Sequence, residues 1–366
     1  MLTYWLWVKR FLILTGILVV SLSVFNLIVD PNGVFGFISL EGFNKHKTDT
    51  LTDRITKFYY VKRFAPDTLI LGTSRAAFLS PADLETYTKG RAFNLGTYAS
   101  TIYQQYLFFK YITDNYTVKN LVLGLDLLAF VSRNEEHQKF DAKRFDNSLY
   151  LKDYVESLFS FTAVQSSFIT VKDNMFRKDI RQNDEQGFRE FNHPKKALDD
   201  RYKKRLARRE KRALKHFATQ YTAGPFNDRE LIAQNLSYLQ KIIDIARAKN
   251  IQYRIYVSPF QSKLFDLIYA SGIGESFEEW KKGIVRITDF VDFTGHNVIT
   301  EDLGWWWDPS HIVSDGGKLI FARLYGDETV AIPKDFGVPV TKDSVDHHLA
   351  LLRKGIQQKD LDAILR

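Results

Sequence analysis

The chain has 366 residues, of which 45% are hydrophobic and 26% are charged, and its formal net charge at pH 7 is +8. This composition is typical of a folded globular protein and excludes a disordered chain, and the length allows one large domain or two ordinary ones. The sequence contains no cysteine, which excludes disulfides, thiolate nucleophiles and cysteine-ligated zinc.

An uncharged, strongly apolar stretch runs from Phe11 to Val29. At a rise of about 1.5 Å per residue its length matches the hydrocarbon thickness of a bilayer. Lys9 and Arg10 precede it and Asp30 follows, so the positive-inside rule predicts a cytoplasmic amino terminus and a main domain on the outer, periplasmic side of the cytoplasmic membrane. No Ala-x-Ala site follows, which favours an uncleaved single-pass anchor over a cleaved signal peptide. Residues 1–30 are therefore expected to form the cytoplasmic terminus and the anchor.

Short apolar runs bounded by turn residues predict five strands in the rest of the chain. Residues 31–64 are first expected to form a linker and a lead-in helix, with helical spacing over 48–64. The strands are predicted at 68–71, 92–95, 121–125, 253–257 and 290–293, and amphipathic helices at 101–113, 228–249, 276–287 and 317–325. Strands that are apolar on both faces and alternate with such helices imply a parallel sheet covered on both sides. The prediction is a three-layer α/β/α sandwich with a five-stranded parallel sheet over 65–343, followed by a terminal amphipathic helix over 344–366.

A long insertion, 132–225, separates the third and fourth predicted strands. Its most charged part, from Arg189 to Lys215, has 12 Lys and Arg against 4 Asp and Glu, a net charge of +8. One interpretation is an amphipathic helix whose charged side is solvated. Another is contact with an anionic surface, either lipid headgroups or an acidic glycan. Nucleic acid is not expected as a partner, because no reading module is present and the segment is predicted to lie outside the cytoplasm.

Two short segments, more than two hundred residues apart, carry the residue types of an activated hydroxyl nucleophile. Leu69–Ser74 reads as a buried strand that stops at a glycine and presents Ser74 at its carboxyl end. Asp308-Pro309-Ser310-His311 supplies a carboxylate and an imidazole on one tight turn. Ser74 would be the nucleophile, His311 its base, and Asp308 would orient the imidazole and stabilise its charged form. The alternatives are a helix N-cap for Ser74 and an ordinary surface turn for the other two.

The order of four such blocks resembles that of the SGNH/GDSL hydrolase superfamily. The blocks are Gly72-Thr73-Ser74, Asn94-Leu95-Gly96, Gly124-Leu125-Asp126 and Asp308-x-x-His311. The resemblance covers most of 65–325 and implies a flavodoxin-like fold. With the anchor, it is similar to membrane-tethered proteins of cell-surface acylation, such as those that help to O-acetylate alginate or to D-alanylate teichoic acids. Such proteins work beside a multi-pass membrane acyltransferase that supplies acyl groups.

Within this resemblance, further residues are expected around the nucleophile. The backbone N–H groups of Ser74 and Gly96 are candidates for the oxyanion hole, with Gly96 letting backbone approach the substrate. Asn94 is either a supporting or substrate contact or a turn residue. The third block departs from the superfamily pattern, because Asp126 stands where an asparagine usually donates to the oxyanion. Arg75 could replace that donor or could pair with Asp126 in a salt bridge.

Three tryptophans, Trp305 to Trp307, directly precede Asp308. Indole rings stack on sugar faces and also fill cores, so Trp307 is a candidate for substrate binding at the rim of the site. No spacing of histidines and carboxylates indicates a metal, and no cofactor is expected.

Three hypotheses for function follow. The first is a membrane-anchored O-acyltransferase that passes an acyl group, most simply acetyl, from Ser74 to a cell-surface polysaccharide. The second is an extracytoplasmic carbohydrate esterase, in which water replaces the sugar. The third is a non-catalytic scaffold of a polysaccharide acylation complex.

Overall fold

The computed structural model describes residues 2–47, 53–132, 140–146, 150–176, 184–191, 200–358 and 360–365. The chain divides into two compact units. Unit 1 comprises Met1–Phe64 and His137–Glu185, and unit 2 comprises Ala65–Glu136 and Gln186–Arg366. The predicted insertion 132–225 is thus shared between them, since its first part groups with the amino-terminal segment and its basic part with the sheet.

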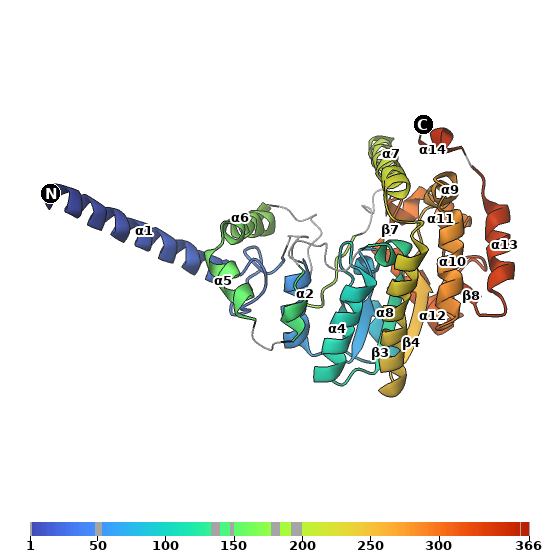
Figure 1. Cartoon of the computed structure of the whole chain (residues 1–366), viewed down its shortest axis with the longest axis horizontal. Helices are drawn as coiled ribbons and strands as arrows, with labels where there is room; N and C mark the ends of the chain where they lie inside the picture. The colour runs from blue at the N-terminus through green and yellow to red at the C-terminus, as the bar shows by residue number, and fades with distance from the viewer. Residues whose placement is uncertain are drawn as a thin grey trace. The chain divides into compact units, whose positions relative to one another are not determined.

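Unit 1 is built on one long apolar helix, α1 (Leu2–Val29), drawn in blue in Figure 1. Its stretch Tyr4–Val29 has a mean hydropathy of 2.5 and only 11% of it is buried, so it is long and apolar enough to cross a membrane. The helix ends against a capping loop. Asn44 Nδ2 and Lys47 Nζ donate to the Val29 carbonyl at 3.2 and 3.1 Å, which satisfies a group that the helix leaves unpaired.

The remaining elements of unit 1 are short. The predicted lead-in helix is present as α2, and residues 48–52 of the prediction lie outside the described part of the chain. The elements are α2 (Asp53–Phe64), the 3₁₀ turn η3 (Ala142–Phe145), α5 (Leu151–Phe159) and α6 (Phe161–Phe176).

Unit 2 contains a six-stranded, mostly parallel sheet with the strand order β2-β1-β3-β4-β5-β8. The strands are β1 (Thr68–Leu71), β2 (Ala92–Asn94), β3 (Asn120–Leu125), β4 (Gln252–Val257), β5 (Phe290–Asp292) and β8 (Val338–Val340). All five predicted strands are present and mutually parallel, within one residue of the predicted bounds. The prediction of five strands in all was wrong, because β8 adds an antiparallel edge next to β5. Val338-Pro339-Val340 carries no strand signal, and a proline is tolerated only at such an edge.

Helices cover this sheet in two groups. The contacts of α4 with α8 and of α8 with α10 define one group, and Figure 1 shows α4 and α8 in front of the strands. The contact between α3 and α12 defines a second. Right-handed crossovers from β1 to β2 and from β2 to β3 run in opposite directions along the sheet, so α3 and α4 cover opposite faces. These helices are α3 (Pro81–Thr88), α4 (Ile102–Asn115), α8 (Arg229–Ala248), α10 (Gly274–Val285) and α12 (Ser314–Tyr325).

The other elements of unit 2 lie around the sheet. The basic segment forms α7 (Asp200–Ala223), which packs against α9 (Ser262–Ala270) and against a small hairpin of β6 (Trp306–Asp308) and β7 (His311–Ile312). The predicted terminal helix is two helices, α13 (Val345–Gly355) and α14 (Leu361–Leu365). Short helical turns complete the unit: η1 (Ala76–Phe78), η2 (Leu127–Phe130), α11 (Val298–Glu301) and η4 (Leu303–Trp305).

Candidate active site

The loop from Gly72 to Arg75, called the nucleophile loop after the candidate nucleophile Ser74, follows β1 at the carboxyl edge of the sheet. At this edge parallel strands present their ligand-binding loops. The chain turns at Gly72, whose φ of +153° and whose closeness to Ala76 leave no room for a side chain, since a Cβ would lie 2.7 Å from Ala76 Cβ. Ser74 follows and is half-buried. It does not cap a helix through its side chain, because Arg75 occupies the N-cap position of η1.

The turn between β6 and β7 presents the carboxylate and the imidazole. Asp308 Oδ1 accepts hydrogen bonds from the backbone N–H groups of Ser310 at 2.9 Å and His311 at 3.1 Å. The same carboxylate lies 2.8 and 3.0 Å from His311 Nδ1 through its two oxygens. The turn therefore fixes Asp308 by its own backbone, and Asp308 in turn fixes the imidazole ring.

Ser74, His311 and Asp308 come together although 237 residues separate the serine from the histidine, and Ser74 Oγ lies 2.8 Å from His311 Nε2. A carboxylate at Nδ1 holds the proton on that nitrogen, which leaves Nε2 free to accept from the Ser74 hydroxyl. The Phe78 ring meets the imidazole edge to face at 5.5 Å and limits its rotation. The His311 and Asp308 side chains are 16% and 17% exposed, so a small substrate can reach the group.

Asp126, after β3, holds the nucleophile loop on both sides of Ser74. Its Oδ2 accepts a very short hydrogen bond from Thr73 Oγ1, and its Oδ1 accepts one from Arg75 Nη1 at 2.5 Å. The carboxylate is 2% exposed, which makes this a buried ion pair. Asp126 is therefore an acceptor here and supplies no donor for an oxyanion.

Arg75 forms the salt bridge that the sequence left as one of two alternatives. Besides pairing with Asp126, it donates from Nε to Ser310 Oγ at 2.9 Å, and its guanidinium lies 4.8 Å from the centre of the Phe260 ring. Nε and Nη1 are thus engaged by Ser310 and Asp126, so Arg75 ties three loops together.

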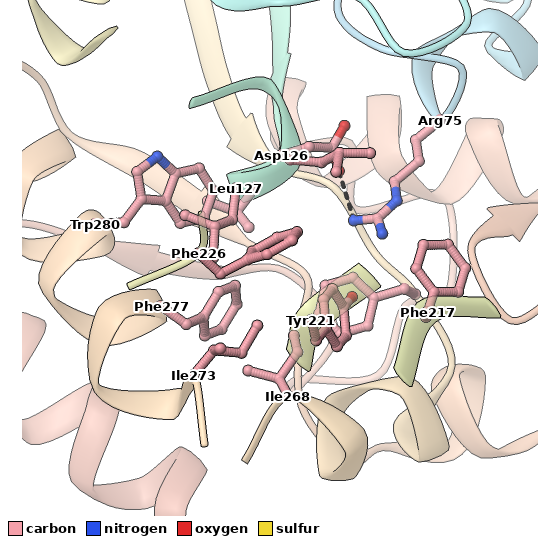
Figure 2. Close-up of a pocket in the computed structure, with 13 residues that line it drawn as sticks. Arg75, Asp126, Leu127, Phe217, Tyr221, Phe226, Ile268, Ile273, Phe277 and Trp280 are labelled. Carbon is pink, nitrogen blue, oxygen red and sulfur yellow. Dashed lines mark hydrogen bonds and ion pairs between the residues drawn. The ribbon is translucent and has the colours of Figure 1, made fainter. Parts of the chain in front are cut away.

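An apolar cavity lies behind the Arg75–Asp126 pair, with room for about one water molecule. Figure 2 shows Arg75 reaching across to Asp126 above a group of aromatic side chains that includes Tyr221 and Phe277. Burial raises the pKa of Tyr221 to about 12, so its hydroxyl is neutral there. Ser74 does not line the cavity, so the cavity is separate from the candidate nucleophile.

The loop after β2 supports the nucleophile loop instead of facing a substrate. Asn94 is fully buried and donates from Nδ2 to the carbonyls of Ala76 at 2.8 Å and Leu79 at 2.7 Å. The Gly96 N–H donates to Asn94 Oδ1 at 2.7 Å, so it is already engaged. A Cβ on Gly96 would lie 2.5 Å from Ala77 N, which shows that this glycine permits close approach of backbone, not of substrate. Among the described residues, the Ser74 N–H has no acceptor, so it is the available donor of the pair that was predicted for an oxyanion hole.

The three tryptophans separate into one core residue and two at the surface. Trp306 is 1% exposed and its indole N–H donates to the Ile299 carbonyl at 2.8 Å. Trp307 is half-buried, next to Asp308, and Arg209 of α7 stacks on its ring at 3.3 Å. Arg209 Nη1 also donates to the Trp307 carbonyl at 3.2 Å, so a cation of α7 contacts the residue that precedes Asp308. Burial lowers the pKa of Arg209, and the charges of Tyr202 and Asp308 oppose that shift.

Several contributors to the site were not identified from the sequence. Thr73 and Ser310 lie inside the motifs, but nothing in their spacing indicates that they bind Asp126 and Arg75. Phe78 and Phe260 read as ordinary core residues. Arg209 was part of the basic run, without a signal for contact with Trp307.

No group of three or more His, Asp or Glu that could hold a metal ion occurs in the part of the chain that the structure describes.

Neither the models of known protein families nor the curated protein sequences give a match to this chain. The α/β fold and the Ser74–His311–Asp308 geometry therefore carry the functional argument.

Proposed function

We propose that this chain is a membrane-anchored O-acyltransferase of the SGNH type, which carries an acyl group, most simply acetyl, on Ser74 and passes it to a hydroxyl of a cell-surface polysaccharide. The observation that carries the proposal is the 2.8 Å approach of Ser74 Oγ to His311 Nε2, with Asp308 at the opposite nitrogen. The order of the five parallel strands, β2-β1-β3-β4-β5, is that of flavodoxin-like sheets and agrees with a three-layer SGNH fold.

The chemistry is a two-step exchange. Ser74 Oγ attacks the carbonyl carbon of the acyl donor while His311 Nε2 takes the hydroxyl proton, and the imidazolium then gives this proton to the departing donor group. In the second step His311 takes a proton from the acceptor hydroxyl, whose oxygen attacks the acyl carbon. The Ser74 oxygen leaves and recovers its proton from His311. Asp308 stabilises the imidazolium in both steps.

Fewer hydrogen-bond donors are available for the oxyanion than in typical hydrolases of the superfamily. The Ser74 N–H is open, whereas the Gly96 N–H and Arg75 are engaged and Asp126 accepts. One lost donor corresponds to about 3 kcal/mol of transition-state stabilisation. A donor from a substrate or a partner protein would restore it, which agrees with a protein that works beside a multi-pass membrane acyltransferase.

The acceptor proposed here is an anionic glycan. The α7 helix carries a basic surface next to the triad, formed by Lys204, Arg205, Arg208, Arg209 and Arg212, which with Tyr202 and Asp200 line one open depression. Trp307 adds a partly exposed ring at the start of this surface. Arg205 lies over the Tyr202 ring and Arg209 over the Trp307 ring. Guanidinium groups beside aromatic rings suit carboxylate-bearing or phosphate-bearing sugars. We propose that α1 anchors the chain in the cytoplasmic membrane with its amino terminus inside and unit 2 in the periplasm.

Mass spectrometry of the full chain after exposure to 4-nitrophenyl acetate tests the proposal. We expect one acetyl group on the peptide that contains Ser74, and none there in Ser74→Ala, while Ser80→Ala, in the same region, retains the label. Absence of label in the wild type would contradict the enzymatic proposal and favour the scaffold. Release of acetate that an added oligosaccharide does not redirect into acetylated sugar would favour the esterase.

A further inference from the structure

Helices α5 and α6 of unit 1 bury several polar side chains and expose large apolar side chains, beside the exposed charges of Lys152, Glu156 and Lys172. On α5, Leu151, Val155 and Phe159 are exposed at a spacing of four residues, which places them on one face. On α6 the exposed apolar residues also recur at helical spacing: Phe161, Phe168, Ile169, Met175 and Phe176. Phe161 is 78% and Phe176 is 75% exposed. An aqueous surface rarely carries so many large apolar side chains together.

The inward faces of the same helices carry polar groups that hydrogen-bond to their neighbours. Asp153 pairs with Arg144 at 2.5 and 2.8 Å, and both side chains are buried. Ser157 accepts from Asn32 at 3.0 Å. Ser167 donates to Asn26, a buried residue of α1, at 2.8 Å. In water, folding is driven by the removal of apolar side chains from the solvent, and the large apolar side chains of α5 and α6 named above stay exposed. This arrangement therefore suits a segment that lies in an apolar surrounding.

The position of the two helices on α1 indicates what this surrounding is. Both pack on the last turns of α1, where the Phe25 and Phe168 rings lie 5.1 Å apart and Asn26 donates to the Leu158 carbonyl at 2.8 Å. Figure 1 shows α5 and α6 beside the end of α1 from which the chain continues. Phe25 precedes Val29 by about 6 Å along the helix axis, so a bilayer that contains the apolar part of α1 reaches the level of this contact. At about 24 Å, α6 is too short to span the bilayer and would lie along its surface.

We infer that α5 and α6 form an interfacial platform whose apolar face enters the lipid leaflet at the carboxyl end of α1. The inference rests on the proposed anchoring of α1. Phe37 and Leu40, in the loop that follows α1, are also exposed apolar residues of unit 1. The ligand of this surface is the boundary between lipid headgroups and acyl chains, which accepts apolar rings without a specific pocket. The platform gives unit 1 a second attachment to the membrane besides its spanning helix.

The absence of cysteine makes a direct test simple. Single cysteines replace Phe161, Phe168, the α1 residue Leu18 and the exposed Val298 of unit 2, and each full-length variant carries an environment-sensitive fluorophore. The variants are reconstituted alone into phosphatidylethanolamine–phosphatidylglycerol vesicles that contain a lipid with a nitroxide high on its acyl chain or one with a nitroxide deep in the bilayer. All four side chains are more than half exposed, so these substitutions are not expected to disturb folding.

We expect the shallow nitroxide to quench the probes at 161 and 168 at least twofold, with no quenching at 298. The probe at 18 is expected to be quenched most by the deep nitroxide. If the probe at 18 is quenched by lipid nitroxide but the probes at 161 and 168 are quenched by aqueous iodide, the interfacial platform is contradicted and the membrane anchor is not. Protection of 161 and 168 from both lipid nitroxide and iodide would also overturn it and point to a protein partner or a second copy. Absence of nitroxide quenching at 18 would contradict the anchoring of α1.

Discussion

Arg75 Nε donates a hydrogen bond to Ser310 Oγ at 2.9 Å, and this contact joins the loop that carries Ser74 to the turn that carries His311. Since the same guanidinium pairs with Asp126, one side chain spans the ends of β1, β3 and the β6–β7 hairpin. The distance between Ser74 and His311 therefore depends on a buried ion pair that touches neither reacting atom.

The first prediction concerns Asp308→Asn. The amide keeps the shape of the carboxylate but can donate to His311 Nδ1, which shifts the ring proton to Nε2 and removes the acceptor for the Ser74 hydroxyl. We expect acylation to slow by about 10⁴-fold with little loss of stability. The release of 4-nitrophenolate in the first turnover measures this rate. An unchanged rate would show that Asp308 is only a turn residue, and Asp315→Asn on α12 is the matched control.

The second prediction concerns the Arg75–Asp126 pair. Asp126→Asn leaves the guanidinium without its buried counter-charge, so we expect a loss of about 3 kcal/mol in the free energy of unfolding and slower acylation. The double variant Arg75→Met/Asp126→Leu removes both charges and should recover most of the stability. Because it lacks the bonds to Thr73 and Ser310, it should not recover the acylation rate. Recovery of both by the double variant would show that the pair contributes to stability alone.

Substitutions of Trp306 and Trp307 should have different effects, the first on stability and the second on binding of the acceptor. Trp306→Ala opens a core site and is expected to cost about 3–5 kcal/mol in the free energy of unfolding. Trp307→Ala removes a partly exposed ring and a stacking partner of Arg209, which should cost about 1 kcal/mol. In Trp307→Ala we expect unchanged acylation of Ser74 but a raised KM for the acceptor. Chemical denaturation and steady-state transfer measure the two effects, and equal KM values would exclude Trp307 from acceptor binding.

The basic face of α7 should act through charge. Arg205→Ala/Arg212→Ala removes two cations from the depression beside Trp307, and we expect the KM for an oligouronate acceptor to rise several-fold at low ionic strength. The difference should shrink as salt screens the remaining charges. A neutral glucan of the same length should respond little, and Lys215→Ala, outside this depression, should behave as the wild type. An effect of the same size with the neutral sugar would argue against an anionic acceptor.

The last prediction concerns pH and His296. Its ring nitrogens lie 2.8 Å from Asp266 and 3.0 Å from Glu301. Burial alone would lower the pKa of His296, but the hydrogen bonds and charges of the two carboxylates outweigh burial and raise it. The stability that this charge contributes is full below about pH 6.5, the ordinary pKa of histidine, and is lost as the pH rises through the raised value.

His296→Gln is therefore expected to lower the thermal midpoint most at acidic pH, and its curve should approach that of the wild type at alkaline pH. Hydrogen exchange of the segment around Gln357, whose N–H donates to Asp266, should follow the same dependence. His347→Gln, at an exposed position, is the control. A pH-independent difference between His296→Gln and the wild type would show that the ring contributes packing and not charge.

Much of the fold followed from the sequence because its signals are local. Apolar runs such as Leu121–Leu125 form buried parallel strands wherever the sheet places them, and the uncharged run from Phe11 to Val29 can only be a long apolar helix. The edge strand Val338–Val340 and the division of the insertion were not predictable in this way. Three residues around a proline have no period, and the inverted pattern of α5 and α6 makes sense only beside α1.

For the site, the sequence by itself determined the chemical types: a serine after a glycine turn, and a histidine three residues after an aspartate. Only the tertiary structure decided that they meet, that Asp126 accepts from Thr73 and Arg75, and that Gly96 lies against the backbone of Ala77. The physical reason is that hydrogen bonds act over about 3 Å, whereas these residues come from strand ends and loops far apart along the chain. Residue types can be read locally from the sequence, but the partner of each hydrogen bond depends on the fold.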